Sequence, residues 1–281
     1  MIGLQPLLLS DEEFHRIRAL VERHAGLQLD GSRKQLVCAR LGGRIRALGL
    51  SSFASYCERA ATDPRELEYL IGALTTHVTS FFREAHHFEF LRRTCAPVWE
   101  REHHRPLRLL SAGCSSGQEP YSIAMTLRDA LHAPRARQPC VVAWDIDQTM
   151  VDAARTGVYS QKQVAELSEE QRTRHFYFGT GRMRGKYKIK PKTAQLVTFQ
   201  RANLLGAWPE TESYDAIFCR NVLIYFSRAR ALTLCRRFAD RLTPDGFLFL
   251  GHSEGITELR DVLEPVGTSV YRARTGQQDR G

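Results

Sequence analysis

Two carboxyl groups and a run of small residues are the features of this sequence most suited to chemistry. Residues 111–117 contain only Ser, Ala, Gly and Cys, and Glu119 follows them. The leucines within 107–110 predict a buried strand, and the apolar residues spaced from 121 to 131 predict a helix with Pro120 in its first turn. The order of strand, small turn and helix is typical of a nucleotide-type site, because the backbone can approach a ligand there.

The spacing argues against the commoner nucleotide motifs. Gly113 and Gly117 do not form G-x-G-x-x-G, and no Lys-Ser/Thr follows as it would in a phosphate-binding loop. Glu119 stands where a pyrophosphate would bind and would repel it. A carboxylate there suits a cationic or polyhydroxyl ligand, such as S-adenosylmethionine with its sulfonium, ammonium and ribose groups. The alternative is an ordinary tight turn of an α/β domain with no ligand.

A second acid supports the nucleoside interpretation. Residues 141–145 predict a strand that ends in Asp145, the position that binds ribose hydroxyls in doubly wound folds. The alternative role is a helix cap, because a helix is predicted from Gln148. Asp147 can provide that cap, so Asp145 remains available for the ribose.

Composition indicates a chain with a large core. The 281 residues are 43% hydrophobic and 25% charged, with a mean hydropathy of −0.34. No apolar run approaches the ~20 residues of a membrane span, and the start lacks the basic segment of a secretory signal. The seven cysteines are scattered without C-x-x-C, so we expect free thiols in the cytoplasm, and neither zinc nor disulfides.

The basic charge is concentrated in two segments. The net charge is +9 and the pI about 9.4, which suggests nucleic acid or an acidic protein surface as a partner. Residues 31–57 and 171–201 contain no acidic residue. A solvated surface usually mixes both signs, so this asymmetry favours binding of a partner.

The remaining elements predict three parts. Residues 1–75 form an all-helical domain, with Ser10 and Glu13 as a capping box and helices near 10–26, 32–48, 53–60 and 64–74. Residues 76–106 form a polar-aromatic connector. Residues 107–281 form an α/β domain with further strands at 196–200, 214–219 and 247–250, a helix at 228–241 and a final edge strand at 268–273. An antiparallel β insertion occupies about 160–201, since residues 186–190 alternate with period two.

Three segments carry a specific resemblance. Residues 111–122, 79–88 (Thr-Ser-Phe-Phe-Arg-Glu-Ala-His-His-Phe) and 218–226 (Phe-Cys-Arg-Asn-Val-Leu-Ile-Tyr-Phe) resemble the CheR family of chemotaxis receptor methyltransferases. The likeness extends over about residues 5–275. It implies an α/β fold, a Rossmann-like methyltransferase sheet with a small antiparallel β insertion, preceded by an all-α N-terminal domain.

The resemblance also implies an activity and a cofactor site. The family transfers a methyl group from S-adenosyl-L-methionine to glutamate carboxylates of chemoreceptors (methyl-accepting chemotaxis proteins), leaving S-adenosyl-L-homocysteine. His77 replaces an Asn that is usual in relatives, and Gln118 replaces a Glu, so the second acid, Glu119, is carried over as the contact. The implied cofactor contacts are His77, Thr79, Arg83, Glu119, Asp145, Asn203, Leu204, Arg220 and Asn221.

Esterification of a carboxylate needs little acid–base chemistry. A Glu side chain, with a pKa of ~4.3, is already ionised at pH 7, so no general base is required. Catalysis then rests on alignment and exclusion of water. Arg83 can orient the carboxylate and Tyr225 can place its hydroxyl near the methyl group; the alternatives are a surface ion pair with Glu84 and plain core packing. We expect no metal, because adjacent His86 and His87 diverge by ~100° on a helix.

The partner is predicted to be the cytoplasmic part of a chemoreceptor, whose helices are rich in Glu. A receptor tail peptide could add a strand to the β insertion. The alternatives are a nucleic-acid methyltransferase, for which no motif is found, and a non-catalytic binding module. We expect a cytoplasmic monomer that binds no nucleic acid and does not insert into membranes. The candidate docking residues are Arg33, Lys34, Arg40, Arg44, Arg46, Lys186 and Lys188.

Overall fold

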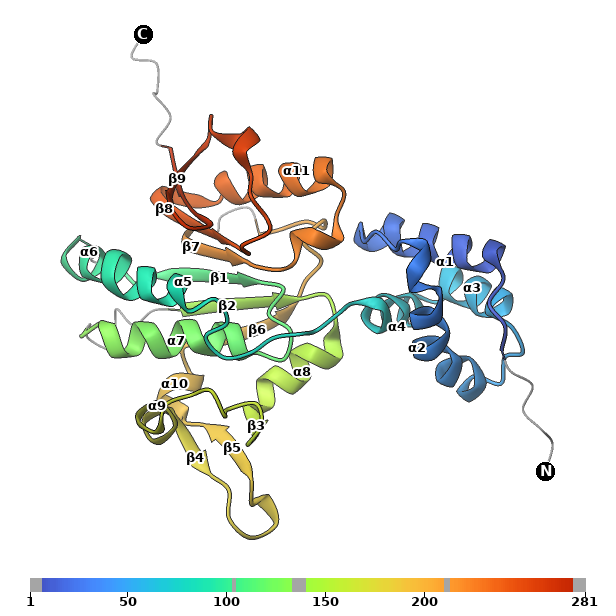
Figure 1. Ribbon diagram of the computed structural model, residues 1–281, viewed down its shortest axis with the longest axis horizontal. Coiled ribbons are helices and arrows are strands. Elements are labelled where there is room, and N and C mark those ends of the chain that lie inside the picture. The colour runs from blue at the N-terminus through green and yellow to red at the C-terminus, as the bar shows by residue number, and fades with distance from the viewer. Residues whose placement is uncertain (1–6, 103–104, 133–139, 210–212, 275–281) are drawn as a thin grey trace. The chain divides into compact units, whose positions relative to one another are not determined.

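The chain divides into two compact units. The computed structural model describes residues 7–102, 105–132, 140–209 and 213–274. One unit comprises Met1–Thr76 with Tyr225–Arg230, and the other comprises His77–Ile224 with Ala231–Gly281 (Figure 1). The start of the chain, where we expect no secretory signal, lies partly outside the described residues. No described helix has the length and apolar character needed to cross a membrane.

The first unit is helical, as predicted. Its elements are α1 (Asp11–Ala25), the 3₁₀ turn η1 (Gly31–Arg33), α2 (Lys34–Ala47), α3 (Phe53–Thr62) and α4 (Pro64–Leu74). Ser10 and Glu13 form the predicted capping box at the start of α1. The apolar stripes of the helices pack together, with Ile17, Val21, Leu41 and Ile45 wholly buried.

The connector begins the second unit. It contains α5 (Ala85–Phe90), a π-helical turn η2 (Leu91–Cys95) and α6 (Ala96–Glu102). Phe88, Leu91 and Trp99 from these helices pack into a core cluster with Ile123 and Leu127. The connector is therefore anchored to the α/β fold that follows it.

The main sheet of the described chain has seven strands in the order β6-β2-β1-β7-β8-β10-β9. Neighbouring strands are parallel from β6 to β8, and β10 is antiparallel to both of its neighbours. The strands are β1 (Arg108–Ala112), β2 (Cys140–Asp145), β6 (Val197–Arg201), β7 (Tyr214–Cys219), β8 (Leu242–Leu250), β9 (Leu263–Gly267) and β10 (Val270–Ala273).

The predicted strand at 268–273 is present as β10, but its predicted position at the edge of the sheet is wrong. Strand β10 lies inside the sheet, and β9, which we did not predict, forms the edge. The sequence signal of β9 is weak because Pro265 and Gly267 are poor strand formers. Pro265 is tolerated there because an edge strand does not need every backbone N–H for pairing. Ser269, at φ 55°, provides the tight turn between the two strands.

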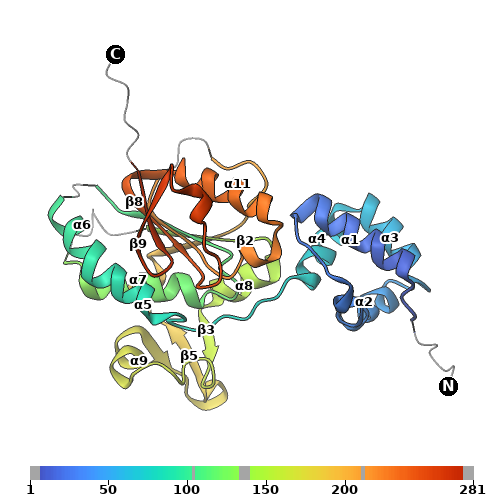
Figure 2. The same ribbon diagram turned by 45° about the horizontal axis from the view of Figure 1, so that its top comes forward.

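Helices cover both faces of the sheet. Figure 2 shows α7 (Gln118–Ala130) and α11 (Arg228–Ala239) on opposite faces. Helix α8 (Gln148–Thr156), which lies between α7 and α11 in the sequence, directly follows β2. On the face away from α7, the ring of Trp144 contacts Trp208, which in turn packs on Phe238 of α11. Both layers are needed because every residue of β7 is buried.

The predicted β insertion forms a separate antiparallel sheet with the order β3-β5-β4. Its elements are β3 (Val158–Ser160), α9 (Glu169–His175), β4 (Phe176–Phe178), η4 (Gly181–Met183), β5 (Lys186–Ile189) and α10 (Pro191–Ala194). At its base, Nε2 of the buried His175 lies 3.1 Å from Oδ2 of Asp129 on α7, and Nδ1 lies 3.1 Å from Oγ1 of Thr193. This network joins the insertion to the main fold.

Candidate functional site

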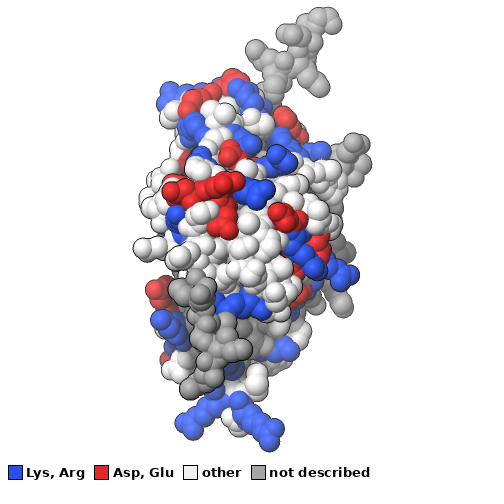
Figure 3. Space-filling model, turned by 90° about the vertical axis from the view of Figure 1, so that its right-hand side faces the viewer, with Lys and Arg blue, Asp and Glu red and all other residues white. Residues whose placement is uncertain are grey.

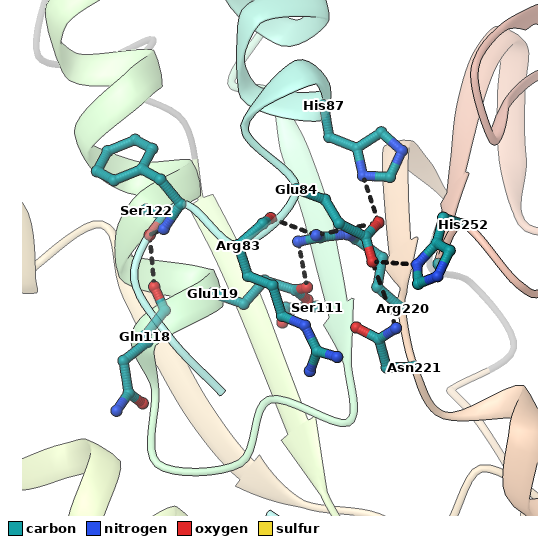
Figure 4. Close-up of polar contacts among 12 residues, drawn as sticks. Arg83, Glu84, His87, Ser111, Gln118, Glu119, Ser122, Arg220, Asn221 and His252 are labelled. Carbon is teal, nitrogen blue, oxygen red and sulfur yellow. Dashed lines mark hydrogen bonds and ion pairs between the residues drawn. The ribbon is translucent and has the colours of Figure 1, made fainter. Parts of the chain in front are cut away.

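Glu119 is held at the carboxyl ends of two adjacent parallel strands. Ser111 of β1 donates to Oε1 of Glu119 at 2.7 Å, and Nη1 of Arg220, which follows β7, donates to Oε2 at 3.1 Å (Figure 4). The Glu119 side chain is 11% exposed and that of Arg220 only 2%. Burial raises the pKa of Glu119, whereas Arg220 and Ser111 act in the opposite direction. Parallel pairing of β1 and β7 brings these distant residues together.

Arg220 also reaches the connector. Its Nη2 lies 3.3 Å from Oε2 of Glu84 and donates to the carbonyl of Arg83. Its guanidinium carbon lies 5.5 Å from the centre of the Phe88 ring. A guanidinium has five N–H donors in a fixed fork, which suits this bridging position. Arg220 therefore joins β7, α7 and the connector at one point.

Glu84 is bonded by residues of two distant segments, 220–221 and 252. Besides Arg220, Nδ2 of Asn221 and Nδ1 of His252 each lie 3.3 Å from its Oε1 (Figure 4). Burial alone would raise the pKa of Glu84, but Arg220 and these hydrogen bonds lower it. The sequence predicts Glu84 only as a surface partner of Arg83, because Arg220, Asn221 and His252 are more than 130 residues away.

The adjacent histidines come close to the same carboxylate. Glu84, His86 and His87 place three potential metal-ligand atoms within 4.8 Å of one another. Burial, followed by the nearby charge of Arg220, lowers the pKa of His87 to about 3, so its ring is neutral at pH 7 and donates from Nε2 to the carbonyl of Thr268. Arg220 already supplies positive charge to Glu84 and would repel a cation. A structural role for the histidines therefore stays our prediction.

Asp145 closes the turn after β1. Its Oδ2 accepts the backbone N–H of Ser115 at 2.7 Å, and its Oδ1 accepts that of Asp147 at 2.9 Å. The residue is 6% exposed, and burial raises its pKa against the effect of these two hydrogen bonds. Each carboxylate oxygen can accept more than one hydrogen bond. The carboxylate therefore keeps the capacity to accept further hydrogen bonds, and its contact with ribose hydroxyls stays a prediction.

His77 bonds to the neighbouring acid. Its Nε2 lies 3.0 Å from Oδ2 of Asp147, whose Oδ1 caps α8 through the N–H of Thr149 at 2.8 Å. The predicted capping role of Asp147 is confirmed. Burial would raise the pKa of Asp147, but the hydrogen bonds from His77 and Thr149 outweigh it and lower the pKa to about 2.

With this geometry established, comparison with known proteins identifies the chain's relatives. Residues 12–75 match the CheR methyltransferase all-alpha domain, and residues 77–272 match the CheR methyltransferase SAM binding domain. The chain belongs to the CheR methyltransferase family. It is 41% identical to the chemotaxis protein methyltransferase of Salmonella typhimurium over 270 residues, which is 95% of this chain and 92% of that protein. It is 40% identical to chemotaxis protein methyltransferase 2 of Pseudomonas aeruginosa over 274 residues, or 96% of each.

Family membership decides between the functions considered from sequence. The chain is an S-adenosylmethionine-dependent methyltransferase of chemotaxis, and its α/β domain binds that cofactor. This result favours the chemotaxis interpretation over the nucleic-acid alternative that the high pI alone suggested.

The other residues that the CheR resemblance indicated are placed as follows. Arg83 donates to the carbonyl of Val78 at 2.9 Å, and Figure 4 shows its guanidinium pointing away from Glu84. Asn203 accepts the N–H of Leu205 at 3.0 Å in a tight turn, and Leu204 is buried. Thr79 is half-buried. Their contacts with the cofactor stay predictions.

Tyr225 belongs to the unit that contains the helical CheR domain. Its carbonyl accepts the N–H of Gln28 at 2.8 Å, and the guanidinium carbon of Arg33 lies 5.8 Å from the centre of its ring. The proposed catalytic role of its hydroxyl stays a prediction.

The backbone around the CheR site is unusually strained. Six described residues other than glycine have positive φ, and four of them lie here: Phe82, Glu84, Ser115 and Asn221. Each such conformation costs roughly 1–3 kcal/mol and persists only where neighbouring contacts hold it. Ser122 Oγ accepts the N–H of Phe82 at 3.0 Å, and Asp145 holds Ser115. Ser122 thus fixes the connector turn that carries Arg83, and Asp145 fixes the turn after β1.

The two glycines of the motif, Gly113 and Gly117, occupy positions where a side chain would not fit. A Cβ on Gly113 would lie 2.4 Å from Val222, and one on Gly117 would lie 2.9 Å from both Ala154 and the Tyr159 hydroxyl. Both glycines also have positive φ. Glycine is therefore required at both positions by backbone conformation and by the neighbouring side chains, and approach of a ligand to this backbone stays a prediction.

Several candidate docking residues have partners inside the helical unit. Nε of Arg44 lies 3.1 Å from Oε2 of Glu66, a side chain only 4% exposed, and Arg40 donates to the carbonyls of Ala73 and Thr75. Lys34 pairs with Asp11 at 2.7 Å, and Arg33 lies 3.7 Å from Asp30. Figure 3 shows basic and acidic side chains interspersed on the face that it presents. The remaining members of the set, Arg46, Lys186 and Lys188, are exposed.

Proposed function

We propose that this CheR-family enzyme methylates glutamate side chains of chemoreceptors and forms glutamyl methyl esters. The observation that carries the proposal is the match of both of its domains to chemotaxis methyltransferases over nearly the whole chain. A protein-glutamate O-methyltransferase needs a site that presents an ionised carboxylate to an electrophile. The described residues are consistent with that requirement, because they offer positioning groups rather than a titrating base.

The proposed roles of the residues follow from their contacts. S-adenosylmethionine, when bound, supplies a methyl group on a positively charged sulfur. Asp145 would accept hydrogen bonds from the ribose hydroxyls, and Glu119, oriented by Arg220, would face the cationic part of the ligand. Arg83 has one N–H directed to Val78 and retains the capacity to bind a carboxylate through others. Tyr225 would contact the reacting groups through its hydroxyl.

The receptor would arrive as a carboxylate that is already ionised, since an unperturbed Glu has a pKa of ~4.3. The protein therefore has to align the reactants and exclude water, and alignment alone can supply ~7–11 kcal/mol of the barrier reduction. An ion pair with Arg83 that is too tight would lower the nucleophilicity of the carboxylate. We expect Arg83 to orient the substrate through one hydrogen bond.

The β insertion is proposed to bind a receptor tail peptide. Strand β4 is an edge of the small sheet, and its Tyr177 and Phe178 are exposed. Phe178 and Tyr187 line a depression of about 530 Å³ together with residues of the segment 161–173. An added strand would pair with the free backbone of β4, and the depression would take its side chains. Lys186 and Lys188 would attract acidic residues of the peptide.

The proposal is tested by transfer of a radiolabelled methyl group to receptor-containing membranes, with RNA and DNA as competing substrates. We expect label on the receptor that is released by mild base, as an ester requires. Base-stable label, or label on nucleic acid, would contradict the proposal. Fractionation of cells tests the expected cytoplasmic location, and sedimentation tests the expected monomer.

A further inference from the structure

Glu254, which the mechanism above does not use, is bonded to the segment that follows β7. The residue is 3% exposed and lies just beyond the end of β8. Its Oε2 accepts the backbone N–H groups of Gly251 at 2.7 Å and of Asn221 at 2.8 Å. Its Oε1 accepts the N–H of Ile224 at 3.2 Å. One buried carboxylate thus satisfies three backbone donors, two of them in residues 221–224.

Residues 251–254 pack tightly against Asn221. A Cβ on Gly251 would lie 2.6 Å from Oε2 of Glu254, 2.8 Å from Nδ2 of Asn221 and 2.9 Å from its backbone nitrogen. Asn221 has φ 58°, a conformation that is uncommon outside glycine and that Asn adopts more readily than most other residues. Glu254 stabilises this conformation by accepting the backbone N–H of Asn221, and Glu84 accepts a hydrogen bond from the Asn221 side chain.

The segment that Glu254 holds is the one that bears functional residues. Arg220 directly precedes Asn221, and Tyr225 directly follows Ile224. A shift of this backbone would change the direction in which each of these side chains leaves the chain. Displacements of about 1 Å in a positioning element can reduce a rate about a hundredfold. Holding residues 221–224 is therefore a requirement of the chemistry as well as of folding.

We infer that Glu254 is a positioning residue that fixes residues 221–224 for methyl transfer. The inference rests on the proposed function of this site. It requires a carboxylate, because two oxygens accept three N–H groups at once. In Glu254→Gln, the amide oxygen can keep the bonds to Gly251 and Asn221, while the NH₂ group faces the N–H of Ile224 and cannot accept from it. The amide variant therefore releases the Ile224 end of the segment and retains the other.

The first test compares Glu254→Gln with Asp215→Asn. Asp215 is an equally buried carboxylate at the opposite end of β7, where it accepts the N–H of Arg108 at 2.9 Å. We expect Glu254→Gln to lower kcat for receptor methylation at least about tenfold, with adenosylhomocysteine affinity within about threefold of wild type because Asn221 stays bonded. The Asp215→Asn variant should have a lower free energy of unfolding, while its kcat stays within about twofold of wild type.

The second test does not depend on activity. Hydrogen exchange should be faster at the Ile224 amide in Glu254→Gln and unchanged at Asn221. Gly251→Ala, which pushes Glu254 and Asn221 apart, should lower kcat as well. Unchanged exchange at Ile224, or a kcat loss equal to that of Asp215→Asn, would overturn the inference. Wild-type protein that fails to methylate receptors would contradict the proposed function alone, and exchange would still decide whether Glu254 anchors the segment.

Discussion

Nη1 of Arg220 lies 3.1 Å from Oε2 of Glu119, and the two side chains are almost completely buried. Arg220→Ala would leave both Glu119 and Glu84 without their main counter-charge. We expect a loss of about 3–5 kcal/mol in the free energy of unfolding. Arg220→Lys keeps the charge but not the forked guanidinium, so its free energy of unfolding should fall by less than that of Arg220→Ala. Urea denaturation measures both, and a loss below about 1 kcal/mol for Arg220→Ala would contradict this account.

Asp145→Asn should weaken binding of adenosylhomocysteine while the domain stays folded. The amide oxygen can keep one of the two backbone hydrogen bonds, but the charged acceptor for the ribose is lost. A hydrogen bond to a charged group contributes about 1.5–3 kcal/mol, so we expect affinity to fall about ten- to a hundredfold by calorimetry. Asp152→Asn, at an exposed acid of α8, is the control and should bind normally. Equal affinity of both variants would remove Asp145 from the cofactor site.

Stability in acid should depend on Asp147. Its pKa in the folded protein, about 2, lies below its ordinary value of 3.8. A carboxyl group with a lowered pKa stabilises the protein above its ordinary pKa, and this contribution is lost as the pH falls through the folded value. We expect Asp147 to contribute about 2 kcal/mol to the free energy of unfolding. This contribution is complete above about pH 5 and declines from about pH 4 toward pH 2.

The variant Asp147→Asn removes this titration and keeps a residue that caps helices well. The difference in unfolding free energy between wild type and variant should therefore shrink as the pH is lowered from about 5 to about 3. Urea denaturation at several pH values measures it. A difference that is constant with pH would show that the pKa of Asp147 is not lowered in the folded protein.

Charge reversal should separate docking from stability in the helical unit. Arg46 is exposed, so Arg46→Glu should leave the free energy of unfolding within about 0.5 kcal/mol and lower receptor methylation about three- to tenfold. Arg44→Glu places a second carboxylate beside the buried Glu66 and should cost about 3 kcal/mol or more. Arg18→Glu, an exposed reversal outside the docking set, controls for net charge. Equal methylation by the Arg46 and Arg18 variants would exclude Arg46 from docking.

The fold was largely predictable because its main elements follow simple patterns. Helix α7 has apolar residues at helical spacing with Pro120 in its first turn, and Ser10 and Glu13 mark the start of α1. Strand β9 escaped prediction because Pro265 and Gly267 interrupt its pattern. Hydrophobic periodicity predicts which residues face a core. It does not predict an edge strand whose pattern is interrupted by residues that are poor strand formers.

The site was predictable only in part. Glu119 and Asp145 were found because each follows a predicted strand, and parallel strands place such residues at one edge. The roles of Glu84 and Glu254 depend on partners that are far away in sequence, and no local pattern distinguishes them from surface acids. The pairing of Arg44 with Glu66, 22 residues away, is hidden in the same way, because the local sequence around Arg44 contains no acidic residue.

The small sheet β3-β5-β4 shares no strand with the larger one, and its base is tied down by His175, Asp129 and Thr193. It is consequently a module that can be exchanged. A homologue's hairpin grafted between β3 and α10, with those three anchors retained, would leave the order of the parallel strands untouched. Evolution or design can therefore change what this module recognises without rebuilding the machinery next to it.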